Sequence, residues 1–154
     1  MPTLQDEIRQ TRPFQSAEQE AAIAVARTAA LLEHSVAEVL KPFGLTPTQF
    51  NALRILRGAG AEGLCRNEVG ARMVAIVPDM TRLLDRLEQM GLVTRQREGT
   101  DRRFVRNRIT PRGLELLASI DPVMADIHAR QLGHIGPGRL RALIDLLEEA
   151  RAKL

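Results

Sequence analysis

The sequence predicts a mainly α-helical protein with one small β-hairpin, and three observations carry this prediction. Residues 17–41 run without proline or glycine and place apolar side chains three and four positions apart, which is the spacing of an amphipathic helix. Residues 93–110 instead hold two short alternating segments joined by a polar, glycine-containing cluster, which is typical of a hairpin. A threonine followed by proline occurs at 46–47 and again at 110–111, and this pair favours the start of a helix.

The composition narrows the class of protein. A chain of 154 residues with 44% hydrophobic and 27% charged residues fits one globular subunit. No apolar run approaches the roughly 18 residues of a membrane span, and the N-terminus lacks the apolar segment of a signal peptide, so we expect a cytoplasmic protein without a membrane partner. One cysteine excludes an internal disulfide, and three widely spaced histidines give no zinc-ligand pattern. We therefore expect neither a metal nor another cofactor.

The first long helix is predicted over residues 17–41, with Ser16 and Gln19 in the arrangement of a capping box. A helix of this length extends about 40 Å, which is too long for a domain of this size to cover. Its apolar seam has the spacing with which one helix meets another and consists of Val25, Ala29, Leu32, Val36, Val39 and Phe43. Packing within one subunit explains the spacing equally well. A dimer partner is, however, the simplest way to bury the apolar seam along the whole length of the helix.

The next helix is predicted over about 47–57. Thr46 and Gln49 form a capping box at its start, and the glycines that follow residue 57 end it. Leu45 and Phe50 stand where the two halves of a hydrophobic staple would be.

Two further helices are predicted at about 66–73 and 78–90, which places two short helices around a tight turn. Pro78 suits the first turn of the second one, Asp79 favours the positive end of its dipole, and Gly91 ends it. Its predicted buried stripe consists of Met80, Leu83, Leu84 and Leu87. Its polar side, which can face DNA, consists of Thr81, Arg82, Asp85 and Arg86.

The hairpin at 93–110 is rich in arginine. Its six cations are Arg95, Arg97, Arg102, Arg103, Arg106 and Arg108. Only Glu98 and Asp101 oppose them, so the hairpin carries about +4 whereas the whole chain carries +3. Such concentration of positive charge indicates a surface that binds nucleic acid. A solvated edge hairpin, whose charges only prevent aggregation, is the competing interpretation.

The chain after the hairpin predicts two more helices. The first begins at Thr110 and Pro111, carries Leu114, Leu117 and Ile120, and continues through Pro122 with a kink. Glycines at 133–138 interrupt it, and the last helix begins at about Arg139. That helix has an apolar stripe that needs a partner, formed by Leu140, Leu143, Ile144 and Leu147.

The order of helices followed by an arginine-rich hairpin resembles the MarR family of bacterial transcriptional regulators, which have a winged helix-turn-helix. The residues that carry the resemblance lie at 45–50, 80–88, 91–93, 101–103 and 109–113. It implies one subunit over 1–154, in which about 45–111 form the winged-helix DNA-binding lobe and about 14–43 and 112–154 form N- and C-terminal dimerisation helices. Residues 80–88 would then enter the major groove and the hairpin, as the wing, would reach the neighbouring minor groove.

The resemblance also implies DNA-binding residues. Thr81, Arg82 and Arg86 match positions that touch phosphates and base edges, and Pro78 and Asp79 lie at the leading end of that helix. The wing signature falls on Asp101, Arg102 and Arg103, where the acid holds the wing in shape and Arg103 is the strongest single candidate for a minor-groove contact. The remaining hairpin arginines, for which phosphate contacts and solubility are equally good explanations, are Arg95, Arg97, Arg106 and Arg108.

The predicted function is that of a homodimeric repressor, with double-stranded DNA carrying a pseudo-palindromic operator as its partner. The resemblance adds release from DNA by a small aromatic ligand, for example a phenol, with His34, Phe43 and Phe50 as pocket candidates that are also plausible core residues. An enzyme is not indicated, because the chain lacks a nucleophile elbow and a phosphate-binding glycine loop. Asp85 and Glu88 are interpreted as a solvated face.

Two alternatives stay open at this point. Cys65 stands where the family favours a serine or threonine cap, at the start of the helix at 66–73, where a helix dipole is compatible with a redox-responsive thiol. A structural, unreactive thiol is the competing interpretation of this residue, and the one that we prefer. A winged helix used only for protein contacts is the second alternative. The usual serine cap of the 78–90 helix is also missing near Ile76 and Val77, and Gly70 replaces a customary alanine.

Overall fold

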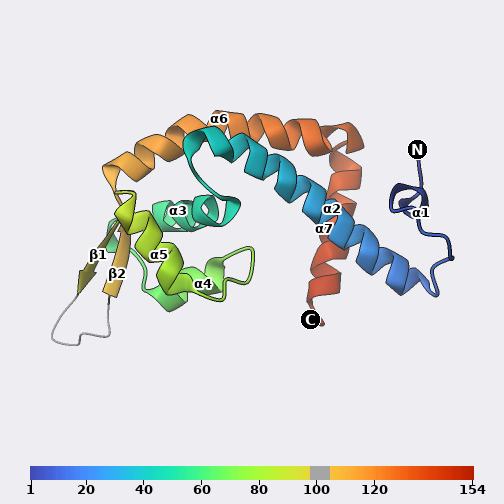
Figure 1. The fold of residues 1–154 in the computed structure, drawn as a ribbon, viewed down its shortest axis with the longest axis horizontal. Coiled ribbons are helices and arrows are strands. Elements are labelled where there is room, and N and C mark those ends of the chain that lie inside the picture. The colour runs from blue at the N-terminus through green and yellow to red at the C-terminus, as the bar shows by residue number, and fades with distance from the viewer. Residues whose placement is uncertain (98–104) are drawn as a thin grey trace.

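The computed structural model describes residues 1–97 and 105–154, and it has the predicted mainly helical architecture with one two-stranded antiparallel sheet. Two long helices, α2 (Ala17–Leu40) and α6 (Pro111–Leu132), lie side by side as an arch (Figure 1). A lobe hangs from one end of the arch and is formed by α3 (Pro47–Ala59), α4 (Arg66–Arg72), α5 (Met80–Gln89), β1 (Val93–Arg97) and β2 (Val105–Ile109). At the other end α7 (Pro137–Arg151) turns down from the end of α6, and the short N-terminal helix α1 (Leu4–Glu7), which the sequence pattern did not predict, lies at the same end of the arch.

Side-chain hydrogen bonds cap the starts of α2 and α3. The Ser16 hydroxyl accepts a hydrogen bond from the Gln19 N–H, as predicted, but the Gln19 side chain reaches back to the N–H of Gln15, not to that of Ser16. At α3 the predicted capping box is complete: Thr46 Oγ1 accepts from the Gln49 N–H at 3.2 Å and Gln49 Oε1 accepts from the Thr46 N–H at 3.0 Å. The N–H groups of Gln19 and Gln49 are among those that the first turn of a helix leaves without a backbone partner.

The two short helices of the lobe begin at different kinds of cap. α4 follows Cys65, whose backbone N–H donates to Glu68 Oε2 at 2.7 Å. α5 follows Asp79, whose Oδ1 accepts from the Arg82 N–H at 2.9 Å. The usual serine cap is missing, as the sequence indicates, and the Asp79 carboxylate takes its place. Pro78 precedes this cap and lies outside the helix, not in its first turn as predicted.

The junction between the hairpin and α6 is closely packed. Thr110 Oγ1 accepts from the Gly113 N–H at 3.1 Å and donates to the Gly91 carbonyl at 2.7 Å, which ties the start of α6 to the end of α5. A Cβ at Gly113 would stand 2.7 Å from the Leu92 carbonyl oxygen and 2.6 Å from a side-chain carbon of Ile109. Only glycine permits this approach, since such a contact is shorter than carbon and oxygen can tolerate.

One hydrophobic core joins the lobe to the arch. It is built from fully buried side chains of both parts: Leu40, Leu117 and Ile120 from the arch, and Leu53, Leu56, Leu84, Leu87 and Leu92 from the lobe. α6 continues through Pro122 as predicted, but Leu114 on the same helix is 43% exposed and takes no part in this core. No helix in the described part of the chain is long and apolar enough to cross a bilayer.

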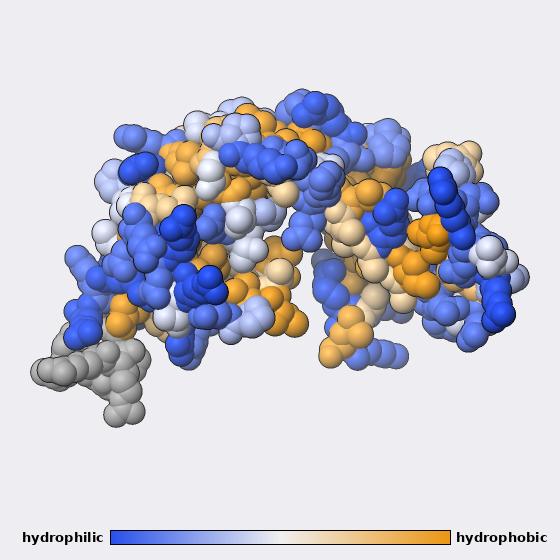
Figure 2. All heavy atoms as spheres, viewed as in Figure 1, coloured by the Kyte–Doolittle hydropathy of each residue, from blue (hydrophilic) through white to orange (hydrophobic). Residues whose placement is uncertain are grey.

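The predicted seam on α2 divides into two halves. Val36, Val39 and Phe43 pack against the core, whereas Val25, Ala29 and Leu32 line an open apolar groove of about 670 Å³. The facing wall of that groove is α7, with the predicted stripe Leu140, Leu143, Ile144 and Leu147. No residue of α7 is buried within the single chain. In Figure 2 apolar side chains reach the surface at this end of the arch.

Candidate nucleic-acid interface

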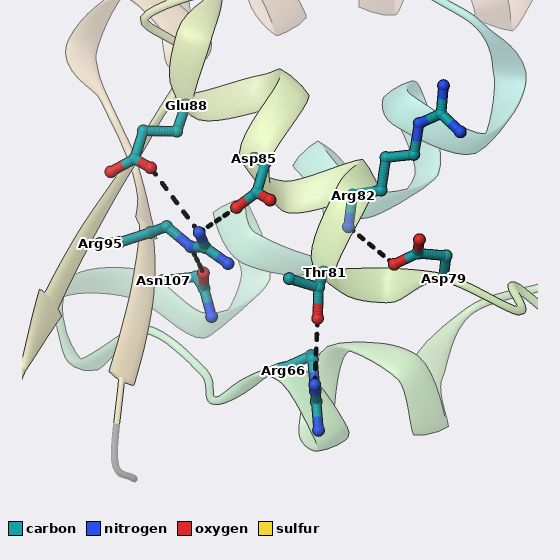
Figure 3. Close-up of polar contacts among 8 residues, drawn as sticks. All are labelled: Arg66, Asp79, Thr81, Arg82, Asp85, Glu88, Arg95 and Asn107. Carbon is teal, nitrogen blue, oxygen red and sulfur yellow. Dashed lines mark hydrogen bonds and ion pairs between the residues drawn. The ribbon is translucent and has the colours of Figure 1, made fainter. Parts of the chain in front are cut away.

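The polar side of α5 is the first component of the site. The helix buries Leu84 and Leu87 and leaves Thr81, Arg82 and Arg86 exposed, which is the division that the sequence predicts. Only the backbone N–H of Arg82 is engaged by the Asp79 cap, and its guanidinium points away from that carboxylate (Figure 3). The exposed side of α5 therefore presents two cations and a hydroxyl on one rigid helix.

The start of α5 is held against α4. Arg66 Nη1 donates to Thr81 Oγ1 at 3.0 Å, and Figure 3 shows this contact beneath the first turn of α5. Arg66 is exposed, so the pair lies at the surface. Sequence reasoning did not single out Arg66, because the two residues are 15 positions apart and belong to different helices.

The hairpin is the second component. Its strands pair antiparallel in the register Val93↔Ile109 to Arg97↔Val105, which confirms the predicted hairpin. Residues 98–104, where the sequence predicts the turn, lie outside the described residues, and three predicted DNA-binding residues are among them, Asp101, Arg102 and Arg103.

The arginines of the strands have different surroundings. Arg95 is held within the lobe: its guanidinium contacts the Asp85 carboxylate, lies 3.8 Å from Glu88 Oε2, and donates from Nε to Asn107 Oδ1 at 3.3 Å. Its side chain is only 23% exposed. Asp85 and Glu88 are thus not simply a solvated face, as the sequence suggested, because they pair with the first strand of the hairpin.

Arg106 and Arg108 also contact other parts of the lobe. Arg106 Nη1 lies 2.9 Å from Glu68 Oε2, and Arg108 Nε donates to the Ala61 carbonyl at 2.7 Å. The pKa of Glu68 is below its usual value, first because the Cys65 backbone N–H donates to it and further because Arg106 lies close. Arg97 is exposed and has no ion pair with a carboxylate among residues 1–97 and 105–154.

Asn107 is a positioning residue that sequence reasoning missed. Its side chain is 1% exposed and Nδ2 donates to the Leu64 carbonyl at 2.9 Å. The backbones of the same two residues exchange hydrogen bonds of 3.0 and 2.8 Å, so Leu64 extends the sheet by one bridge. The sequence feature that could have identified Asn107 is its place in an alternating strand, where it shares the inward face with Val105 and Ile109.

The three predicted ligand residues are not gathered around one cavity. Phe50 is a core residue at 6% exposure, with the Arg54 guanidinium 5.8 Å from its ring centre. His34 is exposed on α2. Phe43 lines a separate open cleft of about 480 Å³ with five other residues, Met90, Leu92, Arg112, Glu115 and Leu116.

The chemistry of the lobe is that of a binding surface. Cys65 is half-buried, and among the described residues no group of three histidine, cysteine, aspartate or glutamate side chains is placed to hold a metal ion. What the lobe offers is a rigid helix with exposed cations beside a strand pair rich in arginine, an arrangement suited to phosphates and base edges.

Comparison with known proteins agrees with this geometry. The sequence model described as MarR family matches residues 43–103. YkoM, an HTH-type transcriptional regulator of Bacillus subtilis strain 168, is 32% identical over 118 residues, which cover 77% of this chain and 75% of YkoM. A MarR transcription factor from Planctomyces limnophilus has a similar crystal structure, with a TM-score of 0.69 and 38% identity over 88% of this chain and 98% of that one.

A third relative has been solved with a small molecule. CouR from Rhodococcus jostii RHA1, bound to p-coumaroyl-CoA, is 25% identical with a TM-score of 0.74, and the match covers 89% of this chain and 95% of CouR. YkoM and the protein from Planctomyces limnophilus are both described as transcription regulators. This chain, with its exposed cationic helix and arginine-rich hairpin, belongs to the MarR family of DNA-binding transcriptional regulators.

Proposed function

We propose that this protein is a homodimeric repressor that binds a pseudo-palindromic operator and releases it when a small aromatic ligand binds. One observation carries the DNA-binding mode: the exposed cationic side of α5 lies beside the hairpin on a single rigid lobe. A helix of this kind fits the major groove, and a hairpin next to it reaches the adjacent minor groove. Two lobes related by a twofold axis would read half-sites about 34 Å apart.

The residues divide by role in this proposal. The residues of α5 that face base edges and nearby phosphates are Thr81, Arg82 and Arg86. On the hairpin, Arg97 and Arg106 contact the phosphate backbone of the DNA. The signature residues of the hairpin turn, Asp101, Arg102 and Arg103, serve the minor groove, as the resemblance implies. Asp79 sets the first turn of α5 through its cap and Pro78 leads into it, so both act on the orientation of the helix.

The dimer is supported by the apolar groove between α2, α6 and α7. Of the residues that line it, Val25 is 52% exposed, Leu143 is 39% exposed and Ile144 is 40% exposed. An apolar face of this extent in a regulator of this family is the surface a second copy would cover, with α7 of each subunit placed against the partner's arch. The N- and C-terminal helices are then the dimerisation helices and residues 45–111 are the DNA-binding lobe.

The ligand part of the proposal concerns the cleft beside Phe43. This cleft lies where the end of α2, the end of α5 and the start of α6 meet, so its occupation would act on both the arch and the lobe. Apolar side chains line it together with one cation, Arg112, and one acid, Glu115, which suits an aromatic molecule that carries polar groups. CouR provides a precedent of an aromatic acyl ligand in a relative.

The test is a fluorescence-anisotropy titration against the DNA upstream of the protein's own gene and against a scrambled duplex, at several salt concentrations. A repressor dimer binds the upstream duplex tightly, and its affinity falls steeply with salt because each phosphate contact adds about 0.9 to the logarithmic slope. Absence of binding even at low salt contradicts the proposal and favours a winged helix used for protein contacts.

A further inference from the structure

Arg95 is the centre of a cluster that connects α5 to the hairpin. The cluster consists of Asp85 and Glu88 from α5, Arg95 from β1 and Asn107 from β2, and we call it the wing–helix clamp. Figure 3 shows Arg95 between the two carboxylates and the asparagine. The guanidinium meets Asp85 directly, and Nε donates to Asn107 Oδ1 at 3.3 Å, so a single side chain bonds to both elements.

The clamp continues into the segment that leads to α4. Asn107 Nδ2 donates to the Leu64 carbonyl, and the two backbones exchange a further pair of hydrogen bonds. Gly63 lies next to this bridge with φ +64°, and a Cβ there would stand 2.4 Å from the Asn107 carbonyl oxygen. The sheet, α5 and the start of α4 are therefore fixed relative to one another by contacts that radiate from Arg95 and Asn107.

The surroundings of Arg95 are unsuited to a phosphate contact. The side chain is 23% exposed, and two acids stand within 3.8 Å of its guanidinium. A DNA phosphate would have to compete with the Asp85 carboxylate for the same N–H groups and would meet the negative charge of both acids. The neighbouring Arg97, by contrast, is exposed on the same strand.

We propose that Arg95 is a positioning residue, which through the wing–helix clamp sets the angle between α5 and the hairpin and so determines discrimination between operator and other DNA. The inference rests on the proposed mode of DNA binding, in which α5 and the hairpin enter neighbouring grooves. A small change in their relative orientation removes base contacts that need both elements in register, whereas phosphate attraction to non-specific DNA tolerates it.

The first test compares Arg95→Met with Arg97→Met, which removes the same charge from an exposed position on the same strand. Anisotropy titrations use the upstream duplex and a scrambled duplex over a series of salt concentrations. For Arg95→Met we expect operator affinity to fall about tenfold, with the affinity for scrambled DNA and its salt slope unchanged. Arg97→Met should weaken both duplexes alike and lower the salt slope by about 0.9 if Arg97 touches a phosphate.

The second test uses Asp85→Asn, which breaks the clamp and leaves every arginine in place. Electrostatics alone predicts tighter DNA binding, because a negative charge is lost from a DNA-binding lobe. The clamp predicts weaker binding to the operator, so the two explanations differ in sign. Arg95→Lys, which keeps the charge opposite Asp85, should restore part of the discrimination that Arg95→Met loses. Circular dichroism at the assay temperature checks that each variant is folded.

The outcomes separate the clamp from the proposed function. A wild-type protein that binds both duplexes equally contradicts the proposed function. A wild type that prefers the operator, with Arg95→Met and Asp85→Asn retaining that preference, overturns the clamp alone. A loss of about 0.9 in salt slope on both duplexes for Arg95→Met also overturns it, since that result identifies Arg95 as a phosphate contact.

Discussion

Arg57 and Asp121 form a two-point ion pair that joins the lobe to the arch. Arg57 Nη1 on α3 donates to Asp121 Oδ2 at 2.7 Å, and Nη2 donates to Oδ1 at 3.1 Å on α6. The pKa of Asp121 is below its usual value, chiefly because of the hydrogen bond from the Arg57 side chain. The pair gives the lobe a polar attachment to α6 in addition to the shared core.

The lowered pKa predicts how the contribution of Asp121 depends on pH. A carboxyl whose pKa is lower in the folded state stabilises the fold above its unfolded pKa of about 3.9, and this stabilisation is lost as pH falls through the folded pKa. Asp121→Asn should therefore lower the melting temperature slightly at pH 7, since both side chains are partly exposed, and the difference from wild type should shrink steadily once pH falls below about 3.9. A difference that stays constant over this range contradicts the assignment.

The apolar groove predicts that α7 controls the oligomeric state. Ile144→Asp places a charge in the groove and should convert a dimer to a monomer in sedimentation equilibrium, with operator affinity falling at least about tenfold because one half-site is lost. Val74→Asp is the control for the oligomeric state alone, since Val74 is 91% exposed and lies outside the groove, but its charge is added to the DNA-binding lobe and would itself act on operator affinity. An Ile144→Asp protein that remains fully dimeric would remove α7 from the interface.

Two glycines near the hairpin allow the cost of an unusual backbone conformation to be measured apart from the cost of a steric clash. Gly60 and Gly63 both have φ +64°, but a Cβ at Gly60 would meet nothing within 4 Å, whereas one at Gly63 would meet the Asn107 carbonyl oxygen. We expect Gly60→Ala to cost about 1 to 3 kcal/mol from its backbone conformation alone, since φ +64° with ψ −150° is adopted almost exclusively by glycine. Gly63→Ala should cost more in the free energy of unfolding, measured by urea denaturation. Equal losses of unfolding free energy in the two variants would mean that the bridge between Leu64 and Asn107 shifts to accommodate the new Cβ at little cost.

The sequence predicted those elements whose causes lie within a few residues. The Thr46 and Gln49 capping box, the threonine and proline at the start of α6 and the alternation of the strands are local patterns, and the structure has them where they were expected. The division of the α2 seam was not predictable in this way, because it depends on where the lobe attaches to the arch. The same holds for the wing–helix clamp. Arg95 is 7, 10 and 12 positions along the chain from Glu88, Asp85 and Asn107. A charged residue on a strand has no local mark that distinguishes an internal ion pair from a DNA contact.

The strongest DNA-contact prediction on the hairpin concerns Arg103, which is identified by the Asp101-x-Arg103 pattern of the sequence. An arginine in a narrow A·T-rich minor groove responds to the enhanced negative potential there, so Arg103→Ala should weaken operator binding by about tenfold when the flanks are A·T-rich. The loss should shrink when the flanks are exchanged for G·C pairs, whose minor groove is wider. Arg12→Ala, which removes a cation from the N-terminal segment outside the lobe, is the control. Anisotropy titrations of both variants on both duplexes measure the effect. If Arg103→Ala loses the same affinity on the two kinds of flank, Arg103 contacts a phosphate and does not recognise the shape of the minor groove.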